Sequence, residues 1–219
     1  LCMDCIAGTY ATMTGNDERS DCVKCEAGKY SNETGATFAN TCLPCRAGTY
    51  LDTEGNDDIT DCTNCNQGKY ITTTGNDNVG GCQDCPAGKF SEVQGAASNA
   101  TCLDCSAGKY SEIPGASSST ACSDCVAGKY SIAEGNNEEA GCELCPCGKF
   151  SDAVGASSDV CEVCPAGTYS ADRGNAEVAD CVDCNAGKFS TAEGMCEDLC
   201  VECVAGKYSA TGGNDAPED

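Results

Sequence analysis

The sequence predicts small disulfide-rich repeats arranged as an elongated rod of tandem β-hairpin modules of about 20 residues, with little or no helix. Three features predict it: a regularly recurring Cys-x-x-Cys pair, 24 cysteines in 219 residues, and one aromatic residue per repeat. A fixed period near 20 residues is typical of stacked units that pack on their neighbours. We therefore expect residues 1–219 to form a single continuous array of eleven repeats. The spacing is 20 residues, and 19 twice, counted from the first cysteines Cys2, Cys22, Cys42, Cys62, Cys82, Cys102, Cys122, Cys142, Cys161, Cys181 and Cys200.

Cysteine chemistry has to stabilise such a chain, because one Tyr or Phe per repeat is too little apolar surface to offset the ordering of the backbone. The cysteine content exceeds the level that is typical of a disulfide scaffold. The spacing Cys-x2-Cys-x16-Cys-x2-Cys also fits a four-thiolate zinc ribbon, which remains the alternative. Against zinc, the eleven pairs are an odd number without a break, and the chain contains no His. We expect an oxidised protein without metal or cofactor.

Each repeat contains two glycines that predict chain reversals. In Pro86-Ala87-Gly88-Lys89 the glycine occupies the position of a type II turn that requires a positive φ. Lys89–Val93 then alternates polar and apolar residues, as a half-buried strand does, and a second glycine follows. The alanine before the first glycine is replaced only by Gln67 and Cys147, which indicates little room at that position. We expect one short hairpin per repeat.

The chain opens at Leu1-Cys2, inside a repeat, without a charged and apolar leader. No apolar run approaches the length of a membrane-spanning helix. We expect a mature or internal piece of an exported protein, located outside the cell or on its surface, with no membrane span in this segment.

Charge and composition limit the possible partners. The net charge is −23, with 12 basic and 35 acidic residues, which disfavours a nucleic-acid partner. The acidic residues predict a solvated, self-repelling surface, with weak calcium binding at the recurring Gly-Asn-Asp segments as the alternative. The sequons at Asn32 and Asn99 predict covalent glycans.

Without His, a Gly-x-Ser-x-Gly motif or a phosphate-binding loop, the sequence does not predict an enzyme.

The motif Cys-x-x-Cys-x-Ala-Gly-Lys-Tyr-Ser-x-x-x-Gly-Ala resembles the ephrin-receptor-like cysteine-rich repeat, which is similar to the first half-module of tumour-necrosis-factor-receptor cysteine-rich domains. The resemblance covers essentially the whole chain. Such modules occur in receptors, adhesins and very large surface proteins of protists and algae, so the motif does not specify an activity. The resemblance implies that the second cysteine of each pair bonds the first cysteine of the next pair: Cys5 with Cys22, Cys25 with Cys42, Cys45 with Cys62, Cys65 with Cys82, Cys85 with Cys102, Cys105 with Cys122, Cys125 with Cys142, Cys145 with Cys161, Cys164 with Cys181, and Cys184 with Cys200.

Two further cysteines, Cys147 and Cys196, stand outside this pattern at different phases of the repeat. They lie about two and a half repeats apart. In a rod with roughly 10 Å per hairpin, that separation is beyond the reach of a disulfide. We expect either local re-pairing with Cys161 or Cys184, or cross-links to another chain.

The implied pairing leaves Cys203 without a downstream partner and Cys2 without an upstream one. A second copy written after Asp219 places its Cys2 21 residues beyond Cys200, nearly in phase with the repeat. We therefore expect head-to-tail continuation, either between chains or within a longer polypeptide, because such a heterologous contact generates a filament. Nearly uniform repeats favour a structural extracellular fibre or surface filament, of the flagellar-hair or cell-coat type. The alternative is the ectodomain of a receptor or protist surface antigen that binds a protein or glycan.

Overall fold

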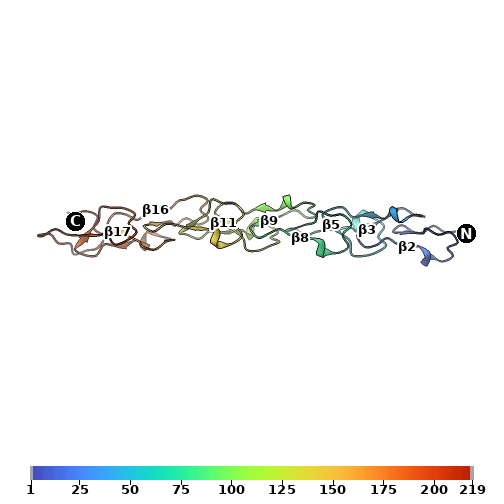
Figure 1. Ribbon diagram of the computed structural model, residues 1–219, viewed down its shortest axis with the longest axis horizontal. Coiled ribbons are helices and arrows are strands. Elements are labelled where there is room, and N and C mark those ends of the chain that lie inside the picture. The colour runs from blue at the N-terminus through green and yellow to red at the C-terminus, as the bar shows by residue number, and fades with distance from the viewer. Residues whose placement is uncertain (1, 218–219) are drawn as a thin grey trace. The chain divides into compact units, whose positions relative to one another are not determined.

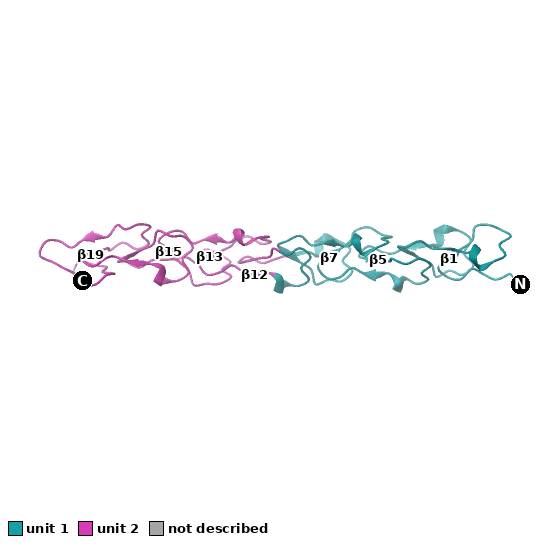
Figure 2. Ribbon diagram, turned by 90° about the horizontal axis from the view of Figure 1, so that it is seen from below, with its two compact units in different colours: residues 1–103, 113–121 teal, residues 104–112, 122–219 magenta. Residues whose placement is uncertain are grey.

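The computed structural model describes residues 2–217. Leu1, Glu218 and Asp219, over which the expected head-to-tail junction runs, lie outside the described residues. The chain divides into two compact units, one of residues 1–103 and 113–121 and the other of residues 104–112 and 122–219 (Figure 2). Within each unit the repeats follow one another in sequence order (Figure 1).

The first unit contains four two-stranded antiparallel sheets, β1-β2, β3-β4, β5-β6 and β7-β8. Its elements are β1 (Thr9–Tyr10), η1 (Arg19–Asp21), β2 (Val23–Lys24), β3 (Lys29–Tyr30), η2 (Ala39–Thr41), β4 (Leu43–Pro44), β5 (Thr49–Tyr50), η3 (Ile59–Asp61), β6 (Thr63–Asn64), β7 (Lys69–Tyr70), η4 (Val79–Gly81), β8 (Gln83–Asp84), β9 (Lys89–Phe90), η5 (Asn99–Thr101) and η6 (Ser119–Ala121). The strand β10 (Leu103–Asp104) lies at the boundary of this unit.

The second unit contains five such sheets, β11-β12, β13-β14, β15-β16, β17-β18 and β19-β20. Its elements are β11 (Lys109–Tyr110), β12 (Ser123–Asp124), β13 (Lys129–Tyr130), η7 (Glu139–Gly141), β14 (Glu143–Leu144), β15 (Lys149–Phe150), β16 (Glu162–Val163), β17 (Thr168–Tyr169), η8 (Val178–Asp180), β18 (Val182–Asp183), β19 (Lys188–Phe189) and β20 (Val201–Glu202).

The predicted class of tandem disulfide-rich hairpin modules is confirmed, and helix in residues 2–217 is limited to 3₁₀ turns of three residues. In a typical hairpin Lys29 lies opposite Pro44 and Tyr30 opposite Leu43. The second strand of each hairpin is therefore the pair of residues between the two cysteines of the next Cys-x-x-Cys. The first glycine forms the predicted type II turn, since Gly88 has a φ of 81° and the Lys89 N–H donates to the Pro86 carbonyl.

The strand predicted over Lys89–Val93 is wrong in length, because β9 ends at Phe90. The next N–H, that of Ser91, donates to the carbonyl of Ala116 at 3.0 Å. Phe90 forms an isolated parallel bridge with the same Ala116. The chain thus leaves its own hairpin after two residues and pairs with the following repeat.

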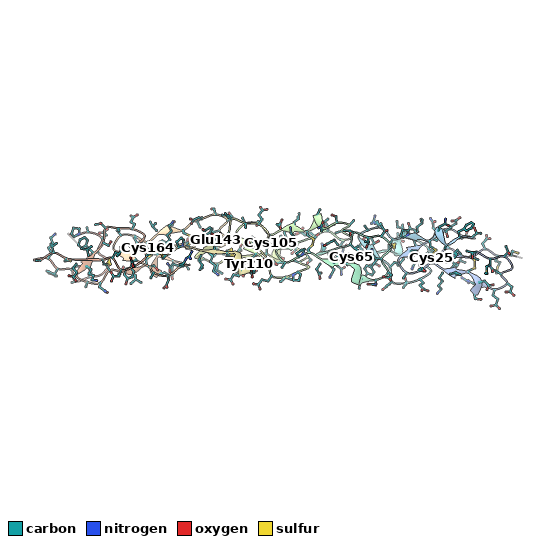
Figure 3. All side chains as sticks on the ribbon, viewed as in Figure 1. Cys25, Cys65, Cys105, Tyr110, Glu143 and Cys164 are labelled. Carbon is teal, nitrogen blue, oxygen red and sulfur yellow. A yellow bond between two sulfur atoms is a disulfide. The ribbon has the colours of Figure 1, made fainter. Side chains whose placement is uncertain are left out.

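The interior consists mainly of disulfide sulfur and small side chains. The second cysteine of each pair from Cys25 to Cys184 is 0% exposed, and Ser31, Ser91 and equivalent serines are also buried. Figure 3 labels four of these cysteines, Cys25, Cys65, Cys105 and Cys164. From Tyr10 to Phe189 the aromatic residue of each repeat is half-buried, whereas Tyr208 in the last repeat and the out-of-phase Phe38 are exposed. Disulfides therefore occupy the place that an apolar core has in a globular domain.

Candidate functional site

A ladder of ten disulfides runs through the repeats. Each bond joins cysteines 16 or 17 residues apart with Cα atoms 5.6 to 5.9 Å apart, within the usual range for disulfides. The pairs are those that the resemblance implies. We call them the ladder disulfides: Cys5–Cys22, Cys25–Cys42, Cys45–Cys62, Cys65–Cys82, Cys85–Cys102, Cys105–Cys122, Cys125–Cys142, Cys145–Cys161, Cys164–Cys181 and Cys184–Cys200.

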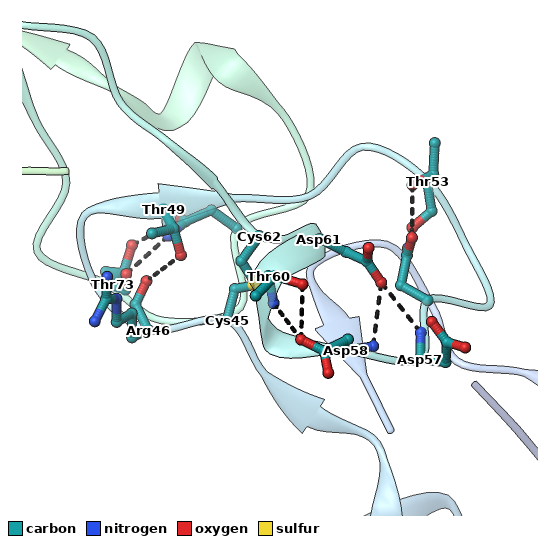
Figure 4. Close-up of a disulfide and its surroundings, with 12 residues drawn as sticks. Cys45, Arg46, Thr49, Thr53, Asp57, Asp58, Thr60, Asp61, Cys62 and Thr73 are labelled. Atoms are coloured by element: carbon teal, nitrogen blue, oxygen red, sulfur yellow. Dashed lines mark hydrogen bonds between the residues drawn. A yellow bond between two sulfur atoms is a disulfide. The ribbon is translucent and has the colours of Figure 1, made fainter. Parts of the chain in front are cut away.

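A capped 3₁₀ turn positions one sulfur of most ladder bonds, as Figure 4 shows for Cys45–Cys62. The Asp58 carboxylate accepts hydrogen bonds from the N–H and the hydroxyl of Thr60, at 2.8 and 2.7 Å. The Asp61 carboxylate in turn accepts from the Asp58 N–H, which completes a capping box at the start of η3. The Thr60 N–H, followed by its hydroxyl, lowers the pKa of Asp58, because both donors favour the charged carboxylate.

Backbone hydrogen bonds connect each repeat to the next. The Gly28 N–H donates to the Leu51 carbonyl and the Cys45 N–H donates to the Gly28 carbonyl, both at 2.8 Å. The Gly55 N–H donates to the Cys25 carbonyl, also at 2.8 Å. The same bonds recur with the repeat period along both units. Each first glycine is therefore a junction between two repeats as well as a turn.

The first glycines also touch the next-but-one repeat, which the sequence did not predict. A Cβ on Gly8 would overlap the carbonyl of Gly55, and a Cβ on Gly28 would overlap that of Gly75. The partner in each case is a second glycine, 46 or 47 residues further on. These glycines have positive φ values, near 80°, and their missing side chains allow two backbones to meet. The same contact recurs at Gly48, Gly68, Gly108, Gly128, Gly148 and Gly167.

The expectation that Cys147 and Cys196 lie too far apart to bond is wrong. They form a disulfide with a Cα–Cα distance of 4.9 Å across a sequence separation of 49 residues. Gly148 follows Cys147 and packs against the backbone of Gly194 and Met195, immediately before Cys196. Because each repeat contacts the next-but-one repeat, residues about two and a half repeats apart in sequence lie close together in space. We call this bond the Cys147–Cys196 tie; re-pairing with Cys161 or Cys184 does not occur, since the ladder holds both.

The tie joins the two shortened repeats. The 19-residue intervals begin at Cys142 and Cys181, and these repeats carry Cys147 and Cys196. Neither has a 3₁₀ turn before its closing cysteine. Instead, the carboxylate of Asp159 accepts from the Cys161 N–H at 3.0 Å, and that of Asp198 accepts from the Cys200 N–H at 3.1 Å. This coincidence of two odd cysteines with two short repeats is the signal that could have predicted the pair.

The Gly-Asn-Asp segments use their asparagines to close loops. The Asn56 side-chain amide donates to the Thr53 carbonyl at 2.6 Å, and that of Asn76 donates to the Thr73 carbonyl at 2.7 Å. Within the described range, 2–217, no group of three or more His, Cys, Asp or Glu is placed to hold a metal ion. Calcium binding at these segments therefore gains no support from their geometry.

The acidic surface is partly neutralised across the hairpins. Lys69 pairs with Asp84 and Lys109 with Asp124, both at 2.5 Å. In the hairpin β13-β14, Tyr130 lies opposite Glu143, and the hydrogen bond to this carboxylate is the main cause that raises the pKa of Tyr130, followed by desolvation. Figure 3 labels Glu143 on β14.

The remaining predicted site residues lie at the surface or near the ends of the chain. Cys2 is exposed and Cys203 half-buried, and neither forms a disulfide. The sequon asparagines Asn32 and Asn99 are both exposed. Among residues 2–217, no helix has the length and apolar character required to cross a membrane.

Comparison with known families agrees with this architecture over part of the chain. The family described as tyrosine-protein kinase ephrin type A/B receptor-like matches residues 72–122. Repeats of this kind are a non-catalytic module type. No curated protein matches the chain. The chain is thus a cysteine-rich tandem-repeat protein, and residues 72–122 are similar to the ephrin-receptor-like family.

Proposed function

We propose that the chain is a structural segment of an extracellular fibre or surface filament, in which residues 1–219 form one continuous array that continues head to tail. The observation that supports this most is a difference among equivalent glycines. Eight first glycines, Gly8 to Gly167, meet a second glycine of the next-but-one repeat, whereas Gly187 and Gly206 have no atom within 4 Å of an added Cβ. At the other end the second glycine Gly15 is equally open, while Gly35 meets the Asp4 side chain. Gly187 and Gly206 thus lack the contact that the other first glycines make, and further repeats of the same type would supply it.

Near the C-terminal end, the residues around Cys203, which forms no disulfide, leave a hollow. Cys203, Gly206 and Tyr208 line a hollow of about 290 Å³ together with Phe189 and Asn214. Tyr208 is 88% exposed, whereas the equivalent aromatic residues are half-buried, each bridged by the following repeat. A further repeat of the same type would cover Tyr208, fill the space beside Gly187 and place a cysteine at Cys203. That repeat belongs to a second copy or to the same polypeptide further on.

The location follows from the chemistry of the ladder. Disulfides persist in oxidising compartments, and a chain with eleven of them points to the outside of the cell or its surface. The acidic surface, with a net charge of −23, keeps such an array soluble and disfavours lateral clumping.

We expect the oxidised chain to form disulfide-linked oligomers through Cys203 of one copy and Cys2 of the next. Ultracentrifugation and electron microscopy without reductant should show end-to-end polymers, and peptide mapping should find the Cys203–Cys2 bond. The Cys203→Ser variant should remain monomeric while keeping the ladder. Monomers whose Cys2 and Cys203 are both alkylated in the absence of reductant, or dimers linked only through identical ends, would contradict the proposal.

The alternative function is a receptor-type ectodomain, favoured by the match of residues 72–122 to a receptor-like family. It differs from the fibre in its assembly. A binding ectodomain stays monomeric under the same oxidising conditions, so the experiment above also separates the two proposals.

We further propose that Asn32 and Asn99 carry N-linked glycan in the native protein. Asn32 follows strand β3 and Asn99 is the first residue of the 3₁₀ turn η5, and both are exposed, as attachment of a glycan requires. Enzymatic deglycosylation in heavy-oxygen water should convert both to labelled Asp, whereas Asn66, an exposed asparagine outside any sequon, should stay unlabelled. Unmodified asparagine at both sequons in native material would overturn this proposal.

A further inference from the structure

The Cys147–Cys196 tie is more accessible than the ladder. From Cys25–Cys42 to Cys184–Cys200, every ladder disulfide includes one cysteine that is 0% exposed. In the tie, Cys196 is exposed and Cys147 half-buried. A thiolate must approach the sulfur that it attacks, so the rate of exchange depends on this access.

The repeats joined by the tie keep their backbone contacts without it. The Gly148 N–H donates to the Ser170 carbonyl and the Gly194 N–H donates to the Cys164 carbonyl, both at 2.8 Å. An untied pair of repeats has the same bonds: the Gly128 N–H donates to Ser151 at 2.7 Å, and the Gly174 N–H donates to Cys145 at 2.8 Å. Most repeats also have alanine where Cys147 stands. Opening the tie therefore leaves the local fold in place.

We infer that the Cys147–Cys196 disulfide is a thiol–disulfide exchange site, which a small neutral or cationic thiol opens while the ladder stays oxidised. The preference for neutral or cationic thiols follows from charge. Glu193 and Glu197 flank Cys196 in a chain with a net charge of −23, so an anionic thiol is repelled. The inference concerns the middle of the second unit and does not depend on polymerisation.

The reaction proceeds in two balanced steps. A reductant thiolate attacks the Sγ of Cys196, which forms a mixed disulfide there and releases Cys147 as a thiolate. A second reductant thiolate then attacks the reductant sulfur of the mixed disulfide and releases Cys196 as a thiolate. Two reductant thiols become one disulfide, and their two electrons reduce Cys147 and Cys196.

The test is graded reduction of the oxidised full chain after Cys2 and Cys203 have been blocked by alkylation. Samples treated with increasing dithiothreitol are quenched in acid, alkylated with a second reagent and mapped by mass spectrometry. Cys147 and Cys196 should be labelled together, at a rate at least about tenfold above the cysteines of the ladder bonds from Cys25–Cys42 to Cys184–Cys200, because a bond with a buried sulfur must first open locally. Labelling of the ladder cysteines at the same rate, or of Cys5 and Cys22 first, would overturn the inference. The bond Cys5–Cys22 is the strictest comparison for the labelling rate, because both of its cysteines are half-buried.

A second arm tests the charge preference. Cysteamine, 2-mercaptoethanol and glutathione are compared at matched thiolate concentration, and the order of rates should be cationic, neutral, anionic. The difference should shrink in high salt, which screens the acidic residues. Equal rates for cysteamine and glutathione at low salt would refute the preference. The double variant Cys147→Ala/Cys196→Ser should lose the fast-labelled pair and keep all ten ladder bonds.

Discussion

Replacement of Gly128 by alanine should lower the free energy of unfolding of the surrounding repeats by about 3 kcal/mol. Two effects add at this position. A Cβ strains a backbone with a φ of 79°, and it overlaps the carbonyl of Gly174 in the next-but-one repeat. Since the overlap is with backbone, one of the two repeats must shift. Native-state hydrogen exchange at the Gly128 and Gly174 amides, which donate to Ser151 and Cys145, measures the loss locally.

Gly187 provides the matched control for this prediction. Its φ is 80°, nearly that of Gly128, yet no atom lies within 4 Å of an added Cβ. Gly187→Ala should therefore cost only the backbone strain, about 1 to 2 kcal/mol. The difference between the two variants isolates the contact between next-but-one repeats. Equal losses for both variants would show that this contact does not contribute to stability.

Loss of one ladder disulfide should have an effect of similar size. The double variant Cys125→Ala/Cys142→Ala removes a bond that closes a 17-residue separation, for which the loop-entropy model gives about 3 kcal/mol. The fully buried Cys125 also leaves a small cavity. Exchange of the Gly155 amide, which donates to the Cys125 carbonyl, should accelerate strongly.

The effect should stay local, because repeats in such arrays are stabilised mainly by their near neighbours. The Gly213 amide, which donates to Cys184, should exchange as in the unmodified chain. The single variant Cys2→Ala removes an exposed cysteine that forms no disulfide in this chain. It should leave the exchange rates of the Gly155 and Gly213 amides unchanged. Uniform acceleration along the whole chain would contradict a locally stabilised array.

The sequence predicts the parts of this fold that depend on local chemistry. The positive φ of Gly88, the recurring hairpins and, within residues 2–217, the restriction of helix to short 3₁₀ turns all follow from turn residues and spacing. The predicted strand over Lys89–Val93 is too long. The alternation of polar and apolar residues indicates a half-buried extended segment, but it does not say with which segment the backbone forms hydrogen bonds. Residues 89 and 90 pair within the hairpin, while Ser91 pairs with Ala116 of the next repeat.

The contact between next-but-one repeats could not be predicted from the repeat period. A spacing of 20 residues gives the order of the units, but not how far each one reaches along the array. The estimate of roughly 10 Å per hairpin treats hairpins as side-by-side layers. In the structure the turn at Gly148 lies on the loop at Gly194, which brings Cys147 and Cys196 together. A glycine at both contact positions of every repeat, together with the two odd cysteines in the two short repeats, is the trace that this packing leaves in the sequence.

The contact between next-but-one repeats is tested most directly by mapping the partner of Cys196 in the oxidised monomer. Cleavage after Glu and Lys separates Cys196 from Cys200 at Glu197, but Cys145 and Cys147 stay in one peptide because only Pro146 lies between them. The structure predicts a three-peptide cluster, in which that peptide holds both the Cys161 peptide and the Cys196 peptide. In the Cys147→Ala variant the Cys196 peptide should leave the cluster. A Cys196 linked to Cys184, to Cys161 or to a second chain would contradict the proposed packing of the repeats.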